Sequence, residues 1–250
     1  MDMNKICVNC TIPLILMLVL FTSCSKRYKI EGKSSVTSLD GKMLYLKSFQ
    51  KGDWVTVDSA EVIHGRFKMK GPADSVRMVT LYMGSEGMMP LVLENGHIRV
   101  SIANTQMEAS GTPLNDRLYE FIDKRNSMEL AIEEVDRKEA RMVLDGVMLD
   151  DVHEQLKQES DSLIHVMDTY VKGFIVDNFE NILGPSIFMM MCSVLPYPMM
   201  TPAIEEILKE APLSFKEHVL VKDFISEAKE NMKLIEEQKR LRQNVASTHP

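Results

Sequence analysis

The sequence predicts an α+β protein in which an N-terminal antiparallel β-sandwich or open barrel is followed by a helical C-terminal region. Apolar and polar residues alternate with a period of two between residues 28 and 110, and apolar residues recur at helical spacing after residue 113. A short apolar run precedes both segments. We therefore expect a signal peptide over 1–23, a β domain over 24–111 and a helical region over 112–250.

The N-terminal segment has the features of an export signal. Lys5 precedes an uncharged run over 12–21, which is too short for a typical membrane-spanning helix and suits the core of a signal peptide. Two small residues then precede Cys24. This pattern resembles a lipoprotein signal, so we expect cleavage before Cys24 and a lipid on its thiol. Ordinary cleavage and an uncleaved anchor are the alternatives.

The cysteines do not predict redox chemistry. Cys7 and Cys10 have the spacing of a thiol pair, but they lie in the segment expected to be removed, and no strand-like segment precedes them. A redox pair begins a helix that follows a strand, because the helix N-terminus lowers the thiol pKa. The remaining thiol, Cys192, lies in an apolar run that predicts a small buried residue.

The charge of the chain limits its partners. The formal net charge is −7, which argues against nucleic acid as a partner because such binding relies on neutralising phosphates with Lys and Arg. It also argues against broad attraction to anionic lipid. We therefore expect acyl chains to supply the contact with the membrane.

Turn and cap residues define the elements. His64-Gly65 and Asn95-Gly96 each separate two alternating segments and suit two-residue hairpin turns, in which both positions need positive φ. Thr112-Pro113 suits the start of a first helix. A second long helix is expected over 149–181, and further helices are expected at "PSIFMMMCSVL", after Thr201-Pro202, and from a capping box of Ser214 with Glu217. We expect the charged end of the last helix to fray or project.

The order of four segments resembles a known family. The segments are "YKIEGKSSVTSLDGKMLYL", "VDSAEVIHGRFKMKGP", "LVLENGHIRVSI" and "SGTPLND". They are similar to the N-terminal domain of unknown function in many Gram-negative lipoproteins, which usually continue into a thioredoxin-like thiol–disulfide oxidoreductase domain. "FIVDNFENILGPSIFMMM" resembles the helical linker between the two domains. The family's Trp-Cys-x-x-Cys matches no position here, so no catalytic residue carries over, and we expect the chain to act without that domain.

Several side-chain groups resemble metal or catalytic sites but lack features that such sites require. His153-Glu154 and His165 with Asp168 have helical spacings that can hold a metal, but two ligands are too few. The 20 methionines suggest a site for a soft metal ion. However, the side chains of adjacent residues on a helix point about 100° apart, so runs of methionine do not gather their sulfurs on one face. Packing in the core is therefore favoured. Ser59 and His64 lack the neighbours that a nucleophile requires. We expect no catalytic residue, no metal site and no cofactor.

The most apolar run after the signal peptide, 187–200, allows two interpretations. It packs against the sandwich and the 149–181 helix, or it exposes a candidate partner patch of Phe188, Met190, Met191 and Tyr197, because Met-rich surfaces adapt to varied ligands.

Together these patterns predict a non-catalytic envelope lipoprotein that acts as an interaction module. It would be anchored at Cys24 to the outer membrane, face the periplasm and bind a protein partner of unknown identity. The alternative is an accessory to a separate thioredoxin-like oxidoreductase. An enzyme of unrecognised type is the third hypothesis.

Overall fold

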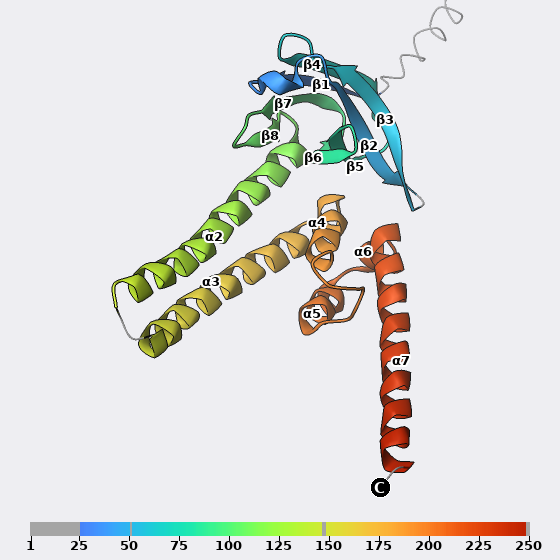
Figure 1. The fold of residues 1–250 in the computed structure, drawn as a ribbon. Helices are drawn as coiled ribbons and strands as arrows, with labels where there is room; N and C mark the ends of the chain where they lie inside the picture. Colours follow the sequence, from blue (N-terminus) through green and yellow to red (C-terminus); the bar gives the residue numbers. More distant parts are fainter. Residues whose placement is uncertain (1–25, 51, 147–148, 249–250) are drawn as a thin grey trace, which may run out of the picture.

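Two four-stranded sheets followed by helices form the protein (Figure 1). The computed structural model describes residues 26–50, 52–146 and 149–248; the expected signal peptide and Cys24 lie outside these residues. One sheet has the order β4-β1-β7-β8 and the other β3-β2-β5-β6. The strands are β1 (Arg27–Ser34), β2 (Met43–Gln50), β3 (Asp53–Glu61), β4 (Arg66–Pro72), β5 (Arg77–Met83), β6 (Glu86–Leu93), β7 (Gly96–Ile102) and β8 (Met107–Ser110). The predicted α+β layout is confirmed, with open sheets.

The two predicted hairpins have different outcomes. His64 and Gly65 have φ values of 52° and 66° and are flanked by a bridge between Ile63 and Arg66, as a tight turn requires. The Asn95-Gly96 hairpin is wrong, because β6 pairs with β5 whereas β7 runs parallel to β1 in the other sheet.

The cause of this crossing is a contact distant in sequence. Asn95 Oδ1 accepts a hydrogen bond of 2.9 Å from the backbone N–H of Arg27. This bond joins the connection between β6 and β7 to the start of β1, where the parallel pairing of β1 with β7 begins. The hairpin expected at Asn95-Gly96 is therefore replaced by a crossing between the sheets.

Six helices follow the sheets among the described residues. The helix α2 (Pro113–Leu144) and α3 (Leu149–Asp177) form a long antiparallel hairpin that leads away from the sheets and back (Figure 1). The others are α4 (Leu183–Cys192), α5 (Pro202–Glu210), α6 (Leu213–Lys216) and α7 (Val219–Thr248). Within the described ranges, no helix is both long enough and apolar enough to cross a membrane.

The helix boundaries follow local hydrogen bonds. The predicted starts at Pro113 and Pro202 are confirmed, and Thr201 Oγ1 accepts a bond of 3.3 Å from the N–H of Ile204. The capping box at Ser214 is wrong. Ser214 Oγ bonds instead with Glu180 Oε1 at 3.3 Å, and the last helix begins only at Val219.

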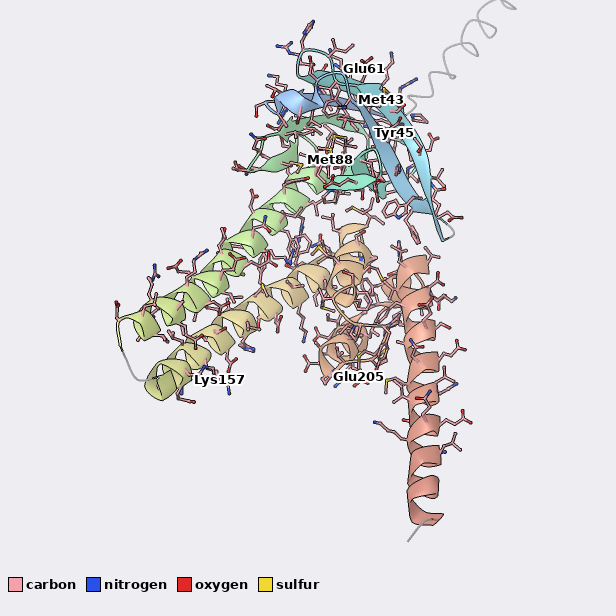
Figure 2. All side chains as sticks on the ribbon, viewed as in Figure 1. Met43, Tyr45, Glu61, Met88, Lys157 and Glu205 are labelled. Atoms are coloured by element: carbon pink, nitrogen blue, oxygen red, sulfur yellow. The ribbon has the colours of Figure 1, made fainter. Side chains whose placement is uncertain are left out.

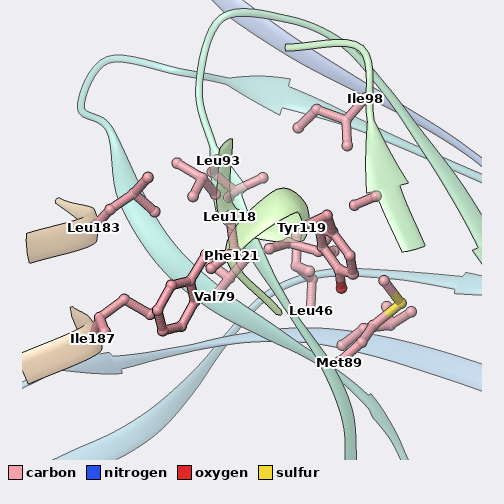
Figure 3. Close-up of a cluster of buried hydrophobic side chains, with 14 of the residues drawn as sticks. Leu46, Val79, Met89, Leu93, Ile98, Leu118, Tyr119, Phe121, Leu183 and Ile187 are labelled. Atoms are coloured by element: carbon pink, nitrogen blue, oxygen red, sulfur yellow. The ribbon is translucent and has the colours of Figure 1, made fainter. Parts of the chain in front are cut away.

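One hydrophobic core joins the sheets to the helices (Figure 3). The first turns of α2 insert apolar side chains between the strands, and α4 adds more from the side. The members labelled in Figure 3 are Leu46, Val79, Met89, Leu93, Ile98, Leu118, Tyr119, Phe121, Leu183 and Ile187. Because each of these elements covers apolar surface of the others, the sandwich and the helical region stabilise one another.

Two of the segments that carry the family resemblance meet at the start of α2. Glu94 Oε1 accepts hydrogen bonds from the N–H groups of Leu114 (2.8 Å) and Asn115 (3.2 Å), which are unpaired donors of the first helical turn. Asn115 in turn accepts from the N–H of Val92 at 2.9 Å and donates to its carbonyl at 2.8 Å. These bonds attach α2 to β6, so "LVLENG" and "SGTPLND" have a structural role.

Candidate functional site

The helical region contains a groove between α3, the end of α4 and α5, which we call the helical groove. Its volume is about 570 Å³. Apolar side chains supply its floor, and charged side chains of α3 and α5 stand at its rim. The residues used below are Met190, Met191, Val194, Leu195, Ile204, Ile207, His165, Asp168, Lys172 and Glu206.

Local sequence explains why apolar surface remains beside the groove. The helix α4 ends at Cys192, and Ser193 Oγ donates to the carbonyl of Met190 at 2.7 Å, which closes the last turn. The chain then turns at Leu195, whose N–H donates to the carbonyl of Cys192. This turn leaves Val194 81% exposed, although it is purely apolar.

An ion-pair network holds one wall of the groove. Lys172 Nζ of α3 lies 3.0 Å from Glu206 Oε2 and 3.3 Å from Glu210 Oε1 of α5. The hydrogen bonds to these two carboxylates raise the pKa of Lys172 above its ordinary value. The ammonium thus bridges α3 and α5 at this wall of the groove.

The structure separates the four residues of the candidate partner patch. Phe188 is fully buried and contacts the rings of Phe215 and Phe224, each at 5.6 Å between centroids, so it does not reach the groove surface. Met190 and Met191 are half-buried and line the groove. Tyr197 is 43% exposed and lies outside the groove lining. The run 187–200 thus supplies both core and groove.

The rejected metal candidates lie on helix surfaces. His153 Nδ1 contacts Glu139 Oε1 of α2 at 3.2 Å, and Lys157 projects into solvent near the far end of the α2–α3 hairpin (Figure 2). His165 and Asp168 are both exposed at the groove. In the part of the chain that the structure describes, no three His, Cys, Asp or Glu side chains are grouped to hold a metal ion.

The rejected catalytic group has structural partners. Asp58 Oδ2 accepts a hydrogen bond of 2.9 Å from the hydroxyl of Tyr28, and its Oδ1 accepts from the N–H of Ser59. Asp58 thereby ties β3 of one sheet to β1 of the other. His64 occupies the turn between β3 and β4.

The remaining thiol is enclosed. Cys192 is 4% exposed in the core, and burial raises the pKa of its thiol to about 12. Because the thiolate is the reactive form, this cysteine is chemically quiet at neutral pH.

Sequence reasoning missed most of the groove and also an aromatic cluster. Val194, Ile204 and Ile207 come from segments whose proximity depends on how α5 folds back, which no local pattern encodes. Trp54 is 51% exposed on the outer face of the sheet β3-β2-β5-β6. Its ring makes edge-to-face contacts with Phe49 and Tyr82, each at 5.5 Å between ring centroids. The alternation on β2, where Leu44, Leu46 and Ser48 are buried, could have indicated that Phe49 faces outward.

The chain was compared with known proteins. No curated protein matches it. Residues 28–118 match the model of a family described as Domain of unknown function (DUF4369). The match begins in β1 and ends in the first turns of α2, so it includes the joint built by Glu94 and Asn115. The resemblance predicted for the N-terminal domain is thereby confirmed over residues 28–118.

Proposed function

We propose that this protein is a non-catalytic, lipid-anchored envelope module that binds a protein partner through the helical groove. The observation that carries the proposal is the apolar surface left open at Met190, Met191 and Val194, between charged side chains of α3 and α5. Contiguous apolar surface with a polar rim is the usual form of a protein-binding site. An amphipathic segment would place apolar side chains on the floor and polar ones against the rim.

The anchor belongs to the same proposal. The signal-like segment that ends at Cys24 supports it, because two small residues precede a cysteine after a short uncharged run. We propose the outer membrane, facing the periplasm, as the location. Replacing Cys24 by Ser should abolish metabolic labelling with a radioactive fatty acid; persistent labelling would rule out acylation at this residue.

The groove is tested by a matched pair of surface substitutions. Val194→Asp places a charge at the groove, whereas Leu213→Asp places one at a 72% exposed position of α6 outside it. Both variants should keep the melting temperature of the wild type. Affinity capture from envelopes should lose a specific partner only with Val194→Asp. Equal capture by the two variants would exclude the groove as the binding site.

The same capture distinguishes the alternative function. An accessory to thiol–disulfide chemistry would co-purify with a thioredoxin-like protein. A partner without a thioredoxin-like domain would leave the general interaction module as the better account.

A further inference from the structure

The outer face of the sheet β4-β1-β7-β8, which we call the basic face, gathers cations on a chain of net charge −7. Alternate residues of these strands are buried, and the residues between them point away from the core. Two carboxylates, Glu31 and Glu108, share this face within the described strands. Its exposed basic side chains are Lys29, Lys33, Arg66, Lys68, Lys70 and Arg99.

The register places like charges opposite each other. Lys29 lies across from Lys70, and Lys33 lies across from Arg66, on the antiparallel pair β1–β4. Like charges at directly opposed positions destabilise a sheet. The two like-charge pairs stand on either side of the opposed pair Glu31 and Lys68, so positive charge is in excess on this strand pair. Such an excess favours a partner that carries negative charge.

The central carboxylate does not offset this charge. Glu31 Oε1 lies 2.9 Å from Lys29 Nζ and 3.2 Å from Lys68 Nζ, and its Oε2 lies 3.0 Å from His97 Nε2. Hydrogen bonds from Lys29 and then Lys68 lower the pKa of Glu31 to about 2. One carboxylate is thus shared between two lysines. The face is also hollowed here, with a volume of about 410 Å³; four cations, Lys33, Arg66, Lys68 and Arg99, and two carboxylates, Glu31 and Glu108, line the hollow.

We propose that the basic face docks on the surface of an anionic lipid bilayer. Local charge, and not the net charge of the chain, sets the field at a surface, and clusters of four to eight Lys and Arg are the usual recognition element for anionic headgroups. This proposal differs from the expectation that the acidic chain avoids such lipid.

The position of the face favours a membrane over an acidic protein. This step rests on the proposed acylation of Cys24. Arg27 begins β1, and three residues of chain span at most about 11 Å, which is close to the Debye length of about 8–10 Å at physiological salt. The first strand of the basic face therefore starts within electrostatic reach of the headgroups.

The test uses the acylated protein bound to vesicles. Vesicles of phosphatidylcholine alone are compared with vesicles that also contain phosphatidylglycerol, and lysine acetylation is measured residue by residue by mass spectrometry. Lys29, Lys33, Lys68 and Lys70 report on the face, and the exposed Lys157 of α3 is the reference (Figure 2). We expect the face lysines to be acetylated several-fold more slowly on the anionic vesicles than on the neutral ones. High salt should restore their reactivity on the anionic vesicles.

Charge reversal at arginines leaves the reporter lysines intact. Arg66→Glu with Arg99→Glu should weaken docking at least about 30-fold, because each basic residue near an anionic surface contributes about a fivefold factor. Lys229→Glu with Lys233→Glu makes the same change in net charge on exposed positions of α7 and should leave the protection unchanged.

The outcomes separate the face from the anchor. Flotation with phosphatidylcholine vesicles tests the anchor alone. If the face lysines are protected on anionic vesicles but the protein does not float with phosphatidylcholine vesicles, docking of the basic face is supported and acylation is contradicted. Flotation on both vesicles with equal acetylation of the face lysines would overturn the docking proposal and leave the anchor standing. Inorganic phosphate or polyglutamate can be added to the protein on neutral vesicles. If either protects the face lysines more than the anionic bilayer does, the docking proposal is also overturned.

Discussion

At the residue scale, Asn115 is the connection between the sandwich and the helical region. Its side chain pairs with both backbone groups of Val92 and donates to Thr112 Oγ1 at 2.8 Å, while it is fully buried. A buried backbone group that loses its partner costs about 1–3 kcal/mol. Asn115 therefore adds to the joint that Glu94 and the shared core also form.

Asn115→Ala should therefore lower the free energy of unfolding by about 1–3 kcal/mol for each of the two backbone groups left unpaired. Urea unfolding followed by circular dichroism measures the change. Asn126→Ala, on the exposed side of the same helix, is the matched control and should stay within about 0.5 kcal/mol of the wild type. Equal stabilities of the two variants would show that the amide is dispensable.

The burial of Cys192 predicts a thiol that does not react in the folded protein. With the pKa raised to about 12, almost no thiolate is present at neutral pH. Site-resolved mass spectrometry should find Cys192 unmodified after iodoacetamide treatment and modified after denaturation. Ser193→Cys, at the exposed neighbouring position, should react without denaturation. Rapid modification of native Cys192 would contradict its placement in the core.

His218 predicts a loss of stability in mild acid. Burial lowers the pKa of His218 below its ordinary value of 6.5, and its buried Nδ1 lacks a hydrogen-bond partner among the described residues. As the pH falls below 6.5, the unfolded chain takes up the proton first, so the folded state loses stability until the lower pKa is passed.

The test compares the wild type with His218→Gln at several pH values. Above pH 7 the imidazole is neutral in both states, and the difference in free energy of unfolding between the two proteins should be constant. Between pH 6.5 and the lower folded pKa it should shift against the wild type. Parallel stability curves across this range would refute the role of His218.

At the element scale, α4 divides its residues between core and groove. Phe188 is fully buried between Phe215 and Phe224, whereas Met190 and Met191 border the groove. One short helix thus sets both the packing of α7 and the shape of the proposed binding surface. Substitutions in α4 should affect stability or binding according to the side on which they lie.

Phe188→Ala should lower the free energy of unfolding by about 3–5 kcal/mol, because it removes a fully buried ring and leaves a cavity. Tyr197→Ala, at a residue that is 43% exposed, is the control and should cost far less. Thermal denaturation distinguishes the two. A Phe188→Ala variant as stable as Tyr197→Ala would mean that the ring is not part of the core.

At the scale of the whole molecule, local patterns predict the elements but not their assembly. Period-two alternation, Pro113, Pro202 and the cap at Thr201 place strands and helices well, since these signals depend on neighbours in sequence. Thr112 makes no capping bond; its hydroxyl accepts from the Asn115 side chain instead. The assignment of β6 and β7 to different sheets depends on pairings distant in sequence, such as that of Tyr28 in β1 with Gly96 in β7, 68 residues apart. A turn motif cannot report such a contact.

The sites divide in the same way. Met190 and Met191 were recognisable from composition, whereas Ile204 and Lys172 enter the groove only through the packing of α5 on α3. The alternating cations of the basic face are visible in the sequence, but their opposition across β1 and β4 emerges only from the register. Net charge averages over such surfaces and therefore hides them.

The most direct test of the proposed function is photo-crosslinking in intact cells. Benzoylphenylalanine introduced at Val194 lies at the groove, and the same residue at Leu213 lies on exposed α6 outside it. We predict a discrete crosslinked protein from position 194 that is absent from position 213. A folded, correctly localised protein that gives no adduct at 194, or the same adducts at both positions, would contradict a partner in the helical groove.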